Sequence, residues 1–449
     1  MKNVSVPFTR ASARAIAVAI APFTLSACVT MMKTAHLTSS RDELRHEIDS
    51  LTSQPAFRNA EWGVLIVNQR TGDTLYSKNA GKLFMPASNV KIVTSAVALT
   101  LLGPEYRYRT TFLGDGEVRD SLLDGNLLVI GRGDPTVSDR MRGTATTVMD
   151  ALADSLRAHR IRQISGSLAR VGNAFPDSIY GAGWEWNDLG EYYGAGVDEL
   201  IFNEGMAPTR LRPAPDTARD SLYSGPARNP AKAYLDALHD GLVRKGIRVD
   251  GGVRGDSILP TPLKMDTLFV LMSPPLREIL PAMMKPSQNQ IAEILLRTIG
   301  LERGGLGTAD SARKIVGRQL LAWGVQPDGF VIVDGSGLSD QDLLTPETIV
   351  RVLDRIQRDT AFTTYYNSMP IAGVDGTIDT RMKGTPAEGN VHAKTGTLAK
   401  ARSLSGYVTT ADGERLIFSI LANNTTTPGS AVTLVADQIA ASLAAYREH

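Results

Sequence analysis

Apolar and polar residues alternate in two well-separated parts of the chain. The stretch "EWGVLIVNQRTGDTLYSKN" (61–79) predicts two strands joined by a turn, and "ARSLSGYVTTADGERLIFSILANN" (401–424) predicts a second such pair. Helical patterns lie outside both pairs. One begins at Ser40, where Glu43 completes a capping box, and the other covers residues 430–449. Because both ends contribute strands and helices of the same kind, we expect one sheet assembled from the two ends.

The middle of the chain has a different pattern. Short strands alternate there with Gly-Asp turns and two amphipathic helices, near residues 146–159 and 229–245. This region is typical of an insertion within the domain formed by the two ends. We therefore predict a signal peptide over 1–27, a tether over 28–39, the first part of the main domain over 40–104, an insertion over 105–266 and the second part of the main domain over 267–449.

The N-terminus has the pattern of a secretory signal. Lys2, Arg10 and Arg14 precede an apolar run over residues 15–25, which is too short to span a bilayer. The run ends in "LSAC", whose Cys28 is the only cysteine of the chain, so no internal disulfide can form. This ending resembles the lipobox of bacterial lipoproteins, which implies lipidation of Cys28 and a membrane anchor.

Ordinary cleavage near the same point is the alternative, but Leu25 is a poor match to the small residue that such cleavage requires. If the host has two membranes, Val29 after the cysteine favours the outer one. The expected localisation is therefore that of a periplasmic lipoprotein anchored in the outer membrane.

Composition narrows the class of protein. The chain has 449 residues, which is too long for one ordinary core, and its 43% hydrophobic and 21% charged residues are typical of a globular protein. The formal net charge is +1 and no long basic run occurs, which argues against a nucleic-acid partner. None of the six histidines forms a metal-binding pair such as HExxH, so we expect neither a metal nor a cofactor.

One predicted helix carries an unexpected charge. The stretch "LFMPASNVKIVTSAVALTLLG" (83–103) is almost wholly apolar, yet it contains Lys91 three residues after Ser88. Residues at this spacing share a helix face, and apolar surroundings lower the pKa of a lysine toward that of a general base. Ser88 and Lys91 are therefore a candidate nucleophile and base. Alternatively, Lys91 extends to solvent and Ser88 only caps the helix.

Ser-x-x-Lys alone does not decide between these interpretations, because "SARK" (311–314) is a second match. The two matches differ in the motifs downstream of each. After Ser88 come "SQN" (287–289) and then "KTGT" (394–397), whereas no Ser-x-Asn occurs after the second match. Only Ser88 begins the ordered series of three motifs.

This series resembles the penicillin-recognising serine enzymes. The large separation of the first two motifs is similar to that in the class C low-molecular-mass penicillin-binding proteins, the D-Ala-D-Ala carboxypeptidase/endopeptidase family. Gln288 stands where the second motif of such enzymes can have Asp, a minor departure. The resemblance implies an α+β fold, with an antiparallel sheet, flanking helices and a large strand-rich insertion. Further similar stretches are "GRGDPTVS" (131–138), "WNDLGEYYGA" (186–195), "SPPLREIL" (273–280), "DGSGLS" (334–339), "IAGVDGTI" (371–378) and "KTGTLAKARSLSGY" (394–407).

The resemblance also implies catalytic roles. Ser88 would attack the carbonyl of the penultimate D-Ala, and Lys91 would accept its proton. Ser287 would relay a proton to the leaving amine, and Asn289 would hydrogen-bond both Lys91 and a substrate amide.

Four residues are expected to bind substrate: Lys394, Thr395, Gly396 and Thr397. Their strand could pair with the peptide, while the ammonium and the threonine hydroxyls suit its terminal carboxylate. Backbone N–H groups of Ser88 and Thr397 would form the oxyanion hole. The expected partners are thus peptidoglycan stem peptides and β-lactam antibiotics.

Three functions remain open from the sequence. The first is a serine D-Ala-D-Ala carboxypeptidase or DD-endopeptidase, and the second is a β-lactamase, against which the large insertion argues. The third is a non-catalytic wall-binding lipoprotein, against which the complete motifs argue. Asp188 and Tyr193 of the insertion could contact the stem peptide, with aromatic packing as the alternative, and Glu293 is either structural or an additional base.

Overall fold

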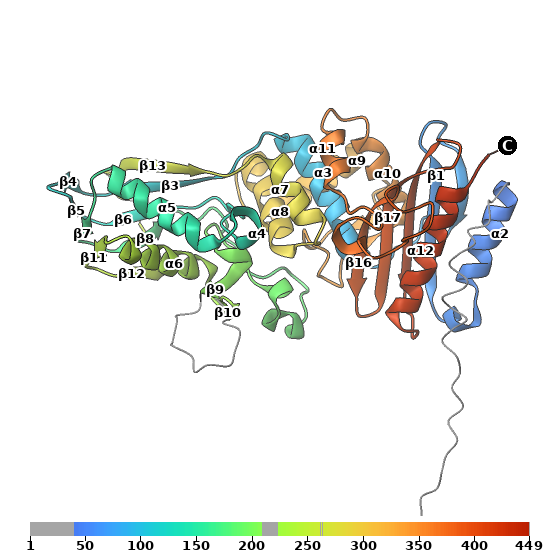
Figure 1. The fold of residues 1–449 in the computed structure, drawn as a ribbon, viewed down its shortest axis with the longest axis horizontal. Helices are drawn as coiled ribbons and strands as arrows, with labels where there is room; N and C mark the ends of the chain where they lie inside the picture. The colour runs from blue at the N-terminus through green and yellow to red at the C-terminus, as the bar shows by residue number, and fades with distance from the viewer. Residues whose placement is uncertain (1–39, 209–222, 261, 263, 449) are drawn as a thin grey trace, which may run out of the picture.

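The computed structural model describes residues 40–208, 223–260, 262 and 264–448. The predicted signal peptide, the tether and Cys28 lie outside these residues. The molecule is elongated: the sheet built from β1 and β17 lies at one end, and the insertion extends away at the other (Figure 1). No helix within the described ranges is long and apolar enough to cross a membrane.

The main sheet joins the two ends of the chain. Its strand order is β16-β17-β18-β1-β2, and all its neighbouring strands are antiparallel. The register of β1 with β18 runs without interruption from Glu61↔Asn423 to Asn68↔Leu416. This confirms the predicted antiparallel sheet. Its strands are β1 (Glu61–Asn68), β2 (Thr74–Lys78), β16 (His392–Leu398), β17 (Ala401–Thr409) and β18 (Arg415–Asn423).

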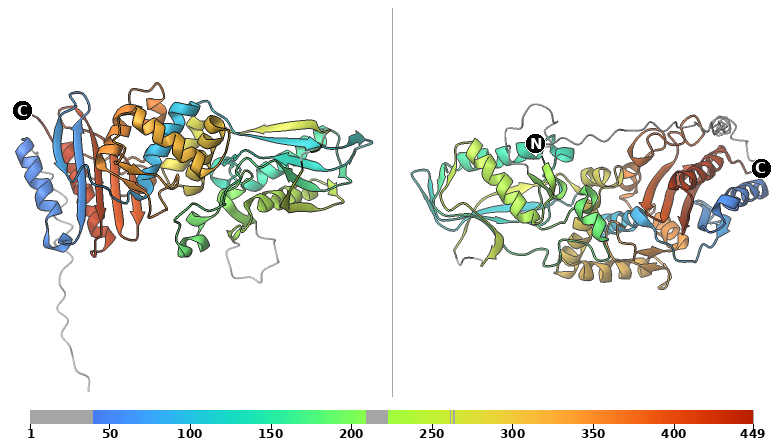
Figure 2. Two further views of the ribbon diagram at one scale, coloured as in Figure 1. Left: turned by 180° about the vertical axis from the view of Figure 1, so that it is seen from behind. Right: turned by 90° about the horizontal axis from the view of Figure 1, so that it is seen from below.

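Helices cover both faces of this sheet (Figure 2). Because successive strand residues point to opposite faces, Val64 and Ile66 pack with α2 (Arg41–Thr52) and α12 (Gly429–Ala445), while Leu65 packs on the other side. Ser40 caps α2 as predicted, since its Oγ accepts a hydrogen bond from the backbone N–H of Glu43. The helices of the other face are α3 (Val90–Leu102), α7 (Leu276–Met284), α8 (Asn289–Gly304), α9 (Ala309–Ala322), α10 (Pro346–Ile356) and α11 (Phe362–Ser368).

Helix α3 lies at the centre of this second layer. Residues 90–99 are all buried, so the helix has no solvent-facing stripe along most of its length. Full burial of each Val, Ile or Leu side chain stabilises the fold by roughly 1.5–3 kcal/mol. The helix ends at Gly103, whose φ of 85° suits glycine. Lys91 is therefore surrounded by core rather than extended to the surface.

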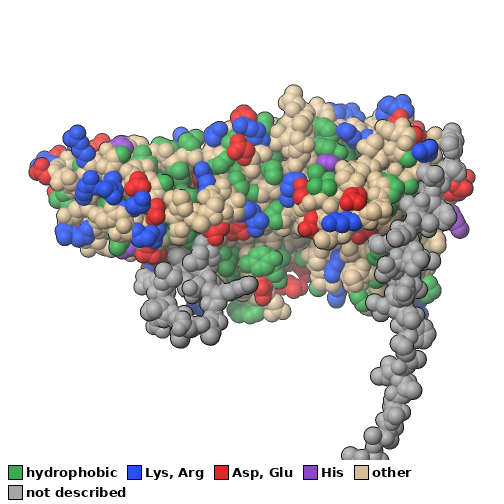
Figure 3. Space-filling view, in the orientation of Figure 1, with side chains coloured by type: hydrophobic (Ala, Val, Ile, Leu, Met, Phe, Trp, Pro, Cys, Tyr) green, Lys and Arg blue, Asp and Glu red, His purple; other side chains and the backbone are tan. Residues whose placement is uncertain are grey.

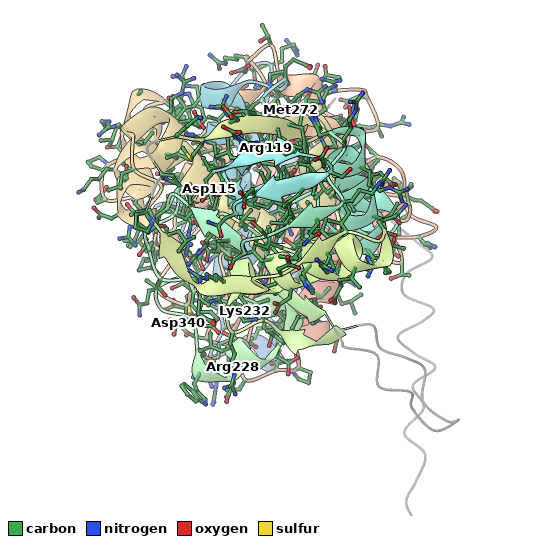
Figure 4. All side chains as sticks on the ribbon, turned by 90° about the vertical axis from the view of Figure 1, so that its left-hand side faces the viewer. Asp115, Arg119, Arg228, Lys232, Met272 and Asp340 are labelled. Carbon is green, nitrogen blue, oxygen red and sulfur yellow. The ribbon has the colours of Figure 1, made fainter. Side chains whose placement is uncertain are left out.

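The insertion has its own hydrophobic core. Helices α5 and α6 pack on one face of a five-stranded mixed sheet of order β12-β8-β6-β3-β13, and a four-stranded sheet of order β11-β7-β5-β4 extends beyond it. In the end-on view of Figure 4, Asp115 and Arg119 lie on this part of the molecule, Lys232 on α6 and Met272 at the end of β13. The main elements are β3 (Arg109–Gly114), β4 (Glu117–Arg119), β5 (Leu122–Asp124), β6 (Leu127–Ile130), α4 (Asp139–Arg142), α5 (Ala145–Ala158), β7 (Gln163–Ile164), β8 (Leu168–Val171), α6 (Pro230–Arg244), β11 (Arg248–Val249), β12 (Val253–Leu259) and β13 (Asp266–Met272).

The structure moves one expected boundary. Residue 266, where we expected the insertion to end, is the first residue of β13, and this strand pairs with β3 from Asp266↔Gly114 to Met272↔Arg109. The sheet of the insertion therefore continues to Met272. The remaining strands form two short pairs, namely β9 (Met206–Pro208) with β10 (Tyr223–Pro226) and β14 (Phe330–Val331) with β15 (Leu343–Leu344).

Candidate active site

Ser88 and Lys91 meet at the start of α3. Ser88 lies in the short 3-10 helix η3 (Ala87–Asn89), which continues directly into α3. The Nζ of Lys91 is 3.0 Å from the Oγ of Ser88, and Lys91 has no exposed surface. Asn89 fixes this segment to the sheet, because its Nδ2 donates to the backbone oxygen of Lys394 over 3.0 Å.

Two acceptors hold the amino group of Lys91. Its Nζ lies 2.7 Å from the Oδ1 of Asn289 and 2.7 Å from the backbone oxygen of Ser336. A protonated lysine would donate to these two oxygens and to Ser88. A neutral lysine has two N–H groups for the two oxygens, and its lone pair then faces the Ser88 hydroxyl. The geometry therefore accommodates the neutral, basic form.

Burial favours that form. The loss of solvation lowers the pKa of Lys91 to about 7, although the nearby carboxyl groups of Asp334, Glu293 and Asp342 act in the opposite direction. Near neutral pH a substantial fraction of Lys91 is thus able to accept a proton. This is the range in which a general base is most effective.

The second motif lies at the start of α8. Ser287 has a φ of 64° and its Oγ accepts a hydrogen bond from the Nζ of Lys394 over 2.8 Å. Asn289 is the first residue of the helix, and its Nδ2 donates to the backbone oxygen of Tyr193 over 2.9 Å. Gln288 caps the helix by accepting from the N–H of Ile291 over 2.7 Å. The middle residue of the motif is therefore structural.

The third motif lies on the edge strand β16. Lys394 is fully buried, and both burial and the proximity of Lys91 lower its pKa well below the usual value. Thr395 and Thr377 share a hydrogen bond of 2.7 Å between their hydroxyl oxygens. Gly396 has no room for a side chain, since a Cβ there would lie 2.6 Å from the backbone oxygen of Pro86. The glycine thus lets β16 approach the segment that carries the nucleophile.

These motifs border one cavity of about 920 Å³. The face shown in Figure 3 is hollowed beside the lobe of the insertion that carries η4 (Trp186–Gly190) and η5 (Tyr192–Gly194), and side chains of both charges are interspersed over it. The cavity is lined by side chains of all three motifs and by insertion residues, so the insertion forms one of its walls. Its lining includes Ser88, Glu185, Asn187, Asp188, Tyr192, Tyr193, Ser287, Asn289, Asp340, Thr377, Thr395, Gly396, Thr397 and Arg402.

The second Ser-x-x-Lys sequence has a different environment. Ser311 and Lys314 lie on α9, and the side chain of Lys314 is 68% exposed. Its Nζ forms an ion pair with Asp310 at 2.7 Å. Of the two serines, therefore, only Ser88 lines the cavity with the other motifs.

Sequence reasoning left two parts of the site without a role. The turn "DGSGLS" supplies the Ser336 carbonyl, and Gly337 approaches so closely that a Cβ would lie 1.9 Å from the backbone oxygen of Ala87. Beneath the turn, Glu293 accepts from the N–H of Gly335 over 2.9 Å, and burial raises its pKa to about 7. Two glycines around a serine were a signal of close backbone approach, but their spatial partner was not evident from the sequence.

The described residues also bear on whether side chains could together bind a metal ion. Within the part of the chain that the structure describes, no group of three or more His, Cys, Asp or Glu side chains could hold a metal ion. The polar groups around Ser88 suit acyl transfer, because they combine a hydroxyl with a buried amine 3.0 Å away.

Comparison with known proteins gives consistent results. A D-alanyl-D-alanine carboxypeptidase of Actinomadura sp. (strain R39) is 31% identical over 91% of this chain and 85% of its own length. The D-alanyl-D-alanine carboxypeptidase DacB of Haemophilus influenzae is 28% identical over 79% of this chain and 84% of its own. The crystal structure of penicillin binding protein 4 (dacB) from Haemophilus influenzae superposes with a TM-score of 0.76 at 26% identity, covering 88% of this chain and 98% of that one. The model of the D-Ala-D-Ala carboxypeptidase 3 (S13) family matches residues 44–227 and 224–446, and the chain therefore belongs to that family.

Proposed function

We propose that this chain is a serine-type D-Ala-D-Ala carboxypeptidase and DD-endopeptidase that acts on peptidoglycan stem peptides through an acyl-enzyme on Ser88. The observation that carries the proposal is the buried Lys91, whose Nζ lies 3.0 Å from the Ser88 hydroxyl and is held by two acceptors. Family membership and the named carboxypeptidase relatives support the substrate class.

In the acylation step, the Oγ of Ser88 attacks the carbonyl carbon of the penultimate D-Ala while its proton moves to Lys91. N–H groups of Ser88 and Thr397 stabilise the negative charge on the carbonyl oxygen. The proton then passes through Ser287 to the leaving amine, the C–N bond breaks and an ester to Ser88 remains. Water attacks this ester in the second step, which releases the shortened peptide and restores the serine.

Substrate binding depends on the edge strand β16. An extended peptide can add to this strand by main-chain hydrogen bonds, as β16 lies at the edge of the sheet. The hydroxyls of Thr395 and Thr397, which line the cavity, and the amino group of the buried Lys394 supply donors for the terminal carboxylate. In a cross-link the leaving amine belongs to another stem peptide, so the same chemistry serves endopeptidase cleavage.

A β-lactam would acylate Ser88 by the same route, and the Haemophilus protein has been solved in complex with a novel β-lactam. The ring-opened amine stays tethered in the site and obstructs water, whereas D-Ala departs. We therefore expect a penicilloyl adduct that persists for minutes or longer. The alternative β-lactamase activity needs an efficient base for deacylation, and Glu293 already accepts a hydrogen bond from Gly335 beneath the site.

The decisive experiment combines two measurements on the purified protein. Mass spectrometry of the intact chain with benzylpenicillin follows the adduct, and D-Ala release is measured from peptides ending in D-Ala-D-Ala and from cross-linked dimers. Release of D-Ala together with a long-lived adduct on Ser88 supports the peptidase. Rapid turnover of penicillin without D-Ala release would establish the β-lactamase instead. The absence of both reactions would favour a non-catalytic wall-binding protein.

We also propose that the chain is exported and anchored through a lipid on Cys28 as a periplasmic lipoprotein of the outer membrane. The basic residues, the short apolar run and "LSAC" support this proposal. Cys28→Ala is expected to yield a soluble or unprocessed form, as followed by membrane fractionation and metabolic labelling with a fatty acid. An unchanged membrane fraction would contradict lipid anchoring.

A further inference from the structure

Residues 178–197 of the insertion form a loop that contacts α8. The same loop also contacts the turn of the catalytic domain formed by residues 334–339. The indole Nε1 of Trp184, which is half-buried, donates to the Oδ2 of Asp334 over 2.9 Å. The backbone also approaches closely at this point, since a Cβ on Gly183 would lie 2.4 Å from the Oγ of Ser339. The insertion thus reaches the turn that lies behind the nucleophile.

Asp334 organises that turn. It is 1% exposed, and its Oδ1 accepts from the N–H groups of Ser336 over 3.0 Å and of Gly337 over 2.5 Å. Its Oδ2 accepts from the N–H of Ser339 over 2.8 Å in addition to the Trp184 indole. These bonds orient the Ser336 carbonyl, which in turn accepts from Lys91 over 2.7 Å. A continuous chain of hydrogen bonds therefore runs from the insertion to the amine beside Ser88.

We propose that Trp184 is a positioning residue for Lys91, because its indole N–H fixes the Asp334 carboxylate that orients the Ser336 carbonyl against the lysine amine. The proposal rests on the proposed function, in which Lys91 is the base. It assigns the insertion a part in the chemical step in addition to its part in forming a wall of the cavity.

The charges around Lys91 predict how the loss of the Trp184 N–H would change the pH dependence of acylation. Glu293 from α8, Asp334 from the turn and Asp342 from the segment after it favour the ammonium form, whereas Lys394 from β16 is a like charge. Removal of the indole donor leaves the charge of Asp334 less compensated, which stabilises the ammonium of Lys91 further. The neutral base then forms only at higher pH, so the acidic limb of the rate profile moves upward.

The test is Trp184→Phe, which keeps an aromatic ring and removes the N–H. We expect a loss of about tenfold in the acylation rate at pH 7, because a smaller fraction of Lys91 is neutral at that pH. Single-turnover acylation by benzylpenicillin is measured from pH 5 to 9. Since a first-order rate constant does not depend on the amount of folded protein, partial unfolding of the variant does not obscure the result.

Trp323→Phe is the matched control, because it removes another half-buried indole at the end of α9. We expect its rate and pH profile to equal those of the unmodified protein. A lower rate and an upward shift of the acidic limb in Trp184→Phe alone support the proposal. Equal profiles in the two variants would overturn it, as would a lower rate without a shift, which indicates a merely structural contact. Failure of the unmodified protein to be acylated would instead refute the proposed function.

Discussion

The chain contains two Ser-x-x-Lys sequences on helices, and their surroundings differ completely. Lys91 is fully buried and bonded to Ser88, Asn289 and Ser336, whereas the side chain of Lys314 is 68% exposed and pairs with the neighbouring Asp310. Burial without a carboxylate in direct contact is what depresses the pKa of a lysine. The spacing of the two residues therefore brings them together, and the rest of the fold determines whether their chemistry changes.

The largest expected difference concerns the two serines. Ser88→Ala should abolish covalent labelling by a fluorescent penicillin, because the attacking oxygen is lost. Ser311→Ala should be labelled like the unmodified chain. Gel fluorescence after a fixed exposure measures both, and labelling that survives Ser88→Ala would contradict the assignment of the nucleophile.

Substitutions at the two lysines should differ nearly as much in their effect on the acylation rate. Lys91→Arg is expected to reduce the acylation rate by about 10²- to 10⁴-fold, because a guanidinium remains protonated and cannot accept the serine proton. Lys314→Arg keeps an exposed positive charge beside Asp310 and should have no effect. Stopped-flow acylation rates distinguish the two variants; a normal rate in Lys91→Arg would exclude this residue as the base.

The pH dependence of acylation should follow Lys91. Its pKa of about 7 means that the ammonium predominates at lower pH, where it cannot act as a base. The acylation rate should therefore fall about tenfold per pH unit below that value and level off above it. Lys314→Met should leave the profile unchanged. A profile that is flat from pH 5 to 9 would show that the rate does not depend on the protonation of Lys91.

The smallest effect is expected for the ion pair on α9. Asp310→Asn removes the partner of Lys314, but exposed pairs in water contribute little to stability. The midpoint of thermal unfolding and the acylation rate should both remain unchanged within error. A clear drop in either would mean that this helix face is more important than its exposure indicates.

Much of this site was predictable from the sequence because local rules apply to it. Strand alternation identified both halves of the sheet, and motif order distinguished Ser88 from Ser311. The contributions of Trp184, Asp334 and Ser336 were not predictable, since they depend on contacts between residues about 150 or more positions apart along the chain. Likewise, β13 was assigned to the wrong side of a boundary, because pairing with β3 is a tertiary contact that no local pattern encodes.

The sheet built from both chain ends has a consequence for the time at which activity appears. Strand β1 pairs along its whole length with β18, and Lys394 enters the site on β16, so the strands that complete the cleft are made after the segments that carry Ser88 and Ser287. The insertion, with a core of its own, can fold earlier. Closing a loop between such distant strands is slow compared with forming local contacts. An incomplete chain would thus carry Ser88 without Lys394, and the hydrolase would remain inert until β16, β17 and β18 had docked.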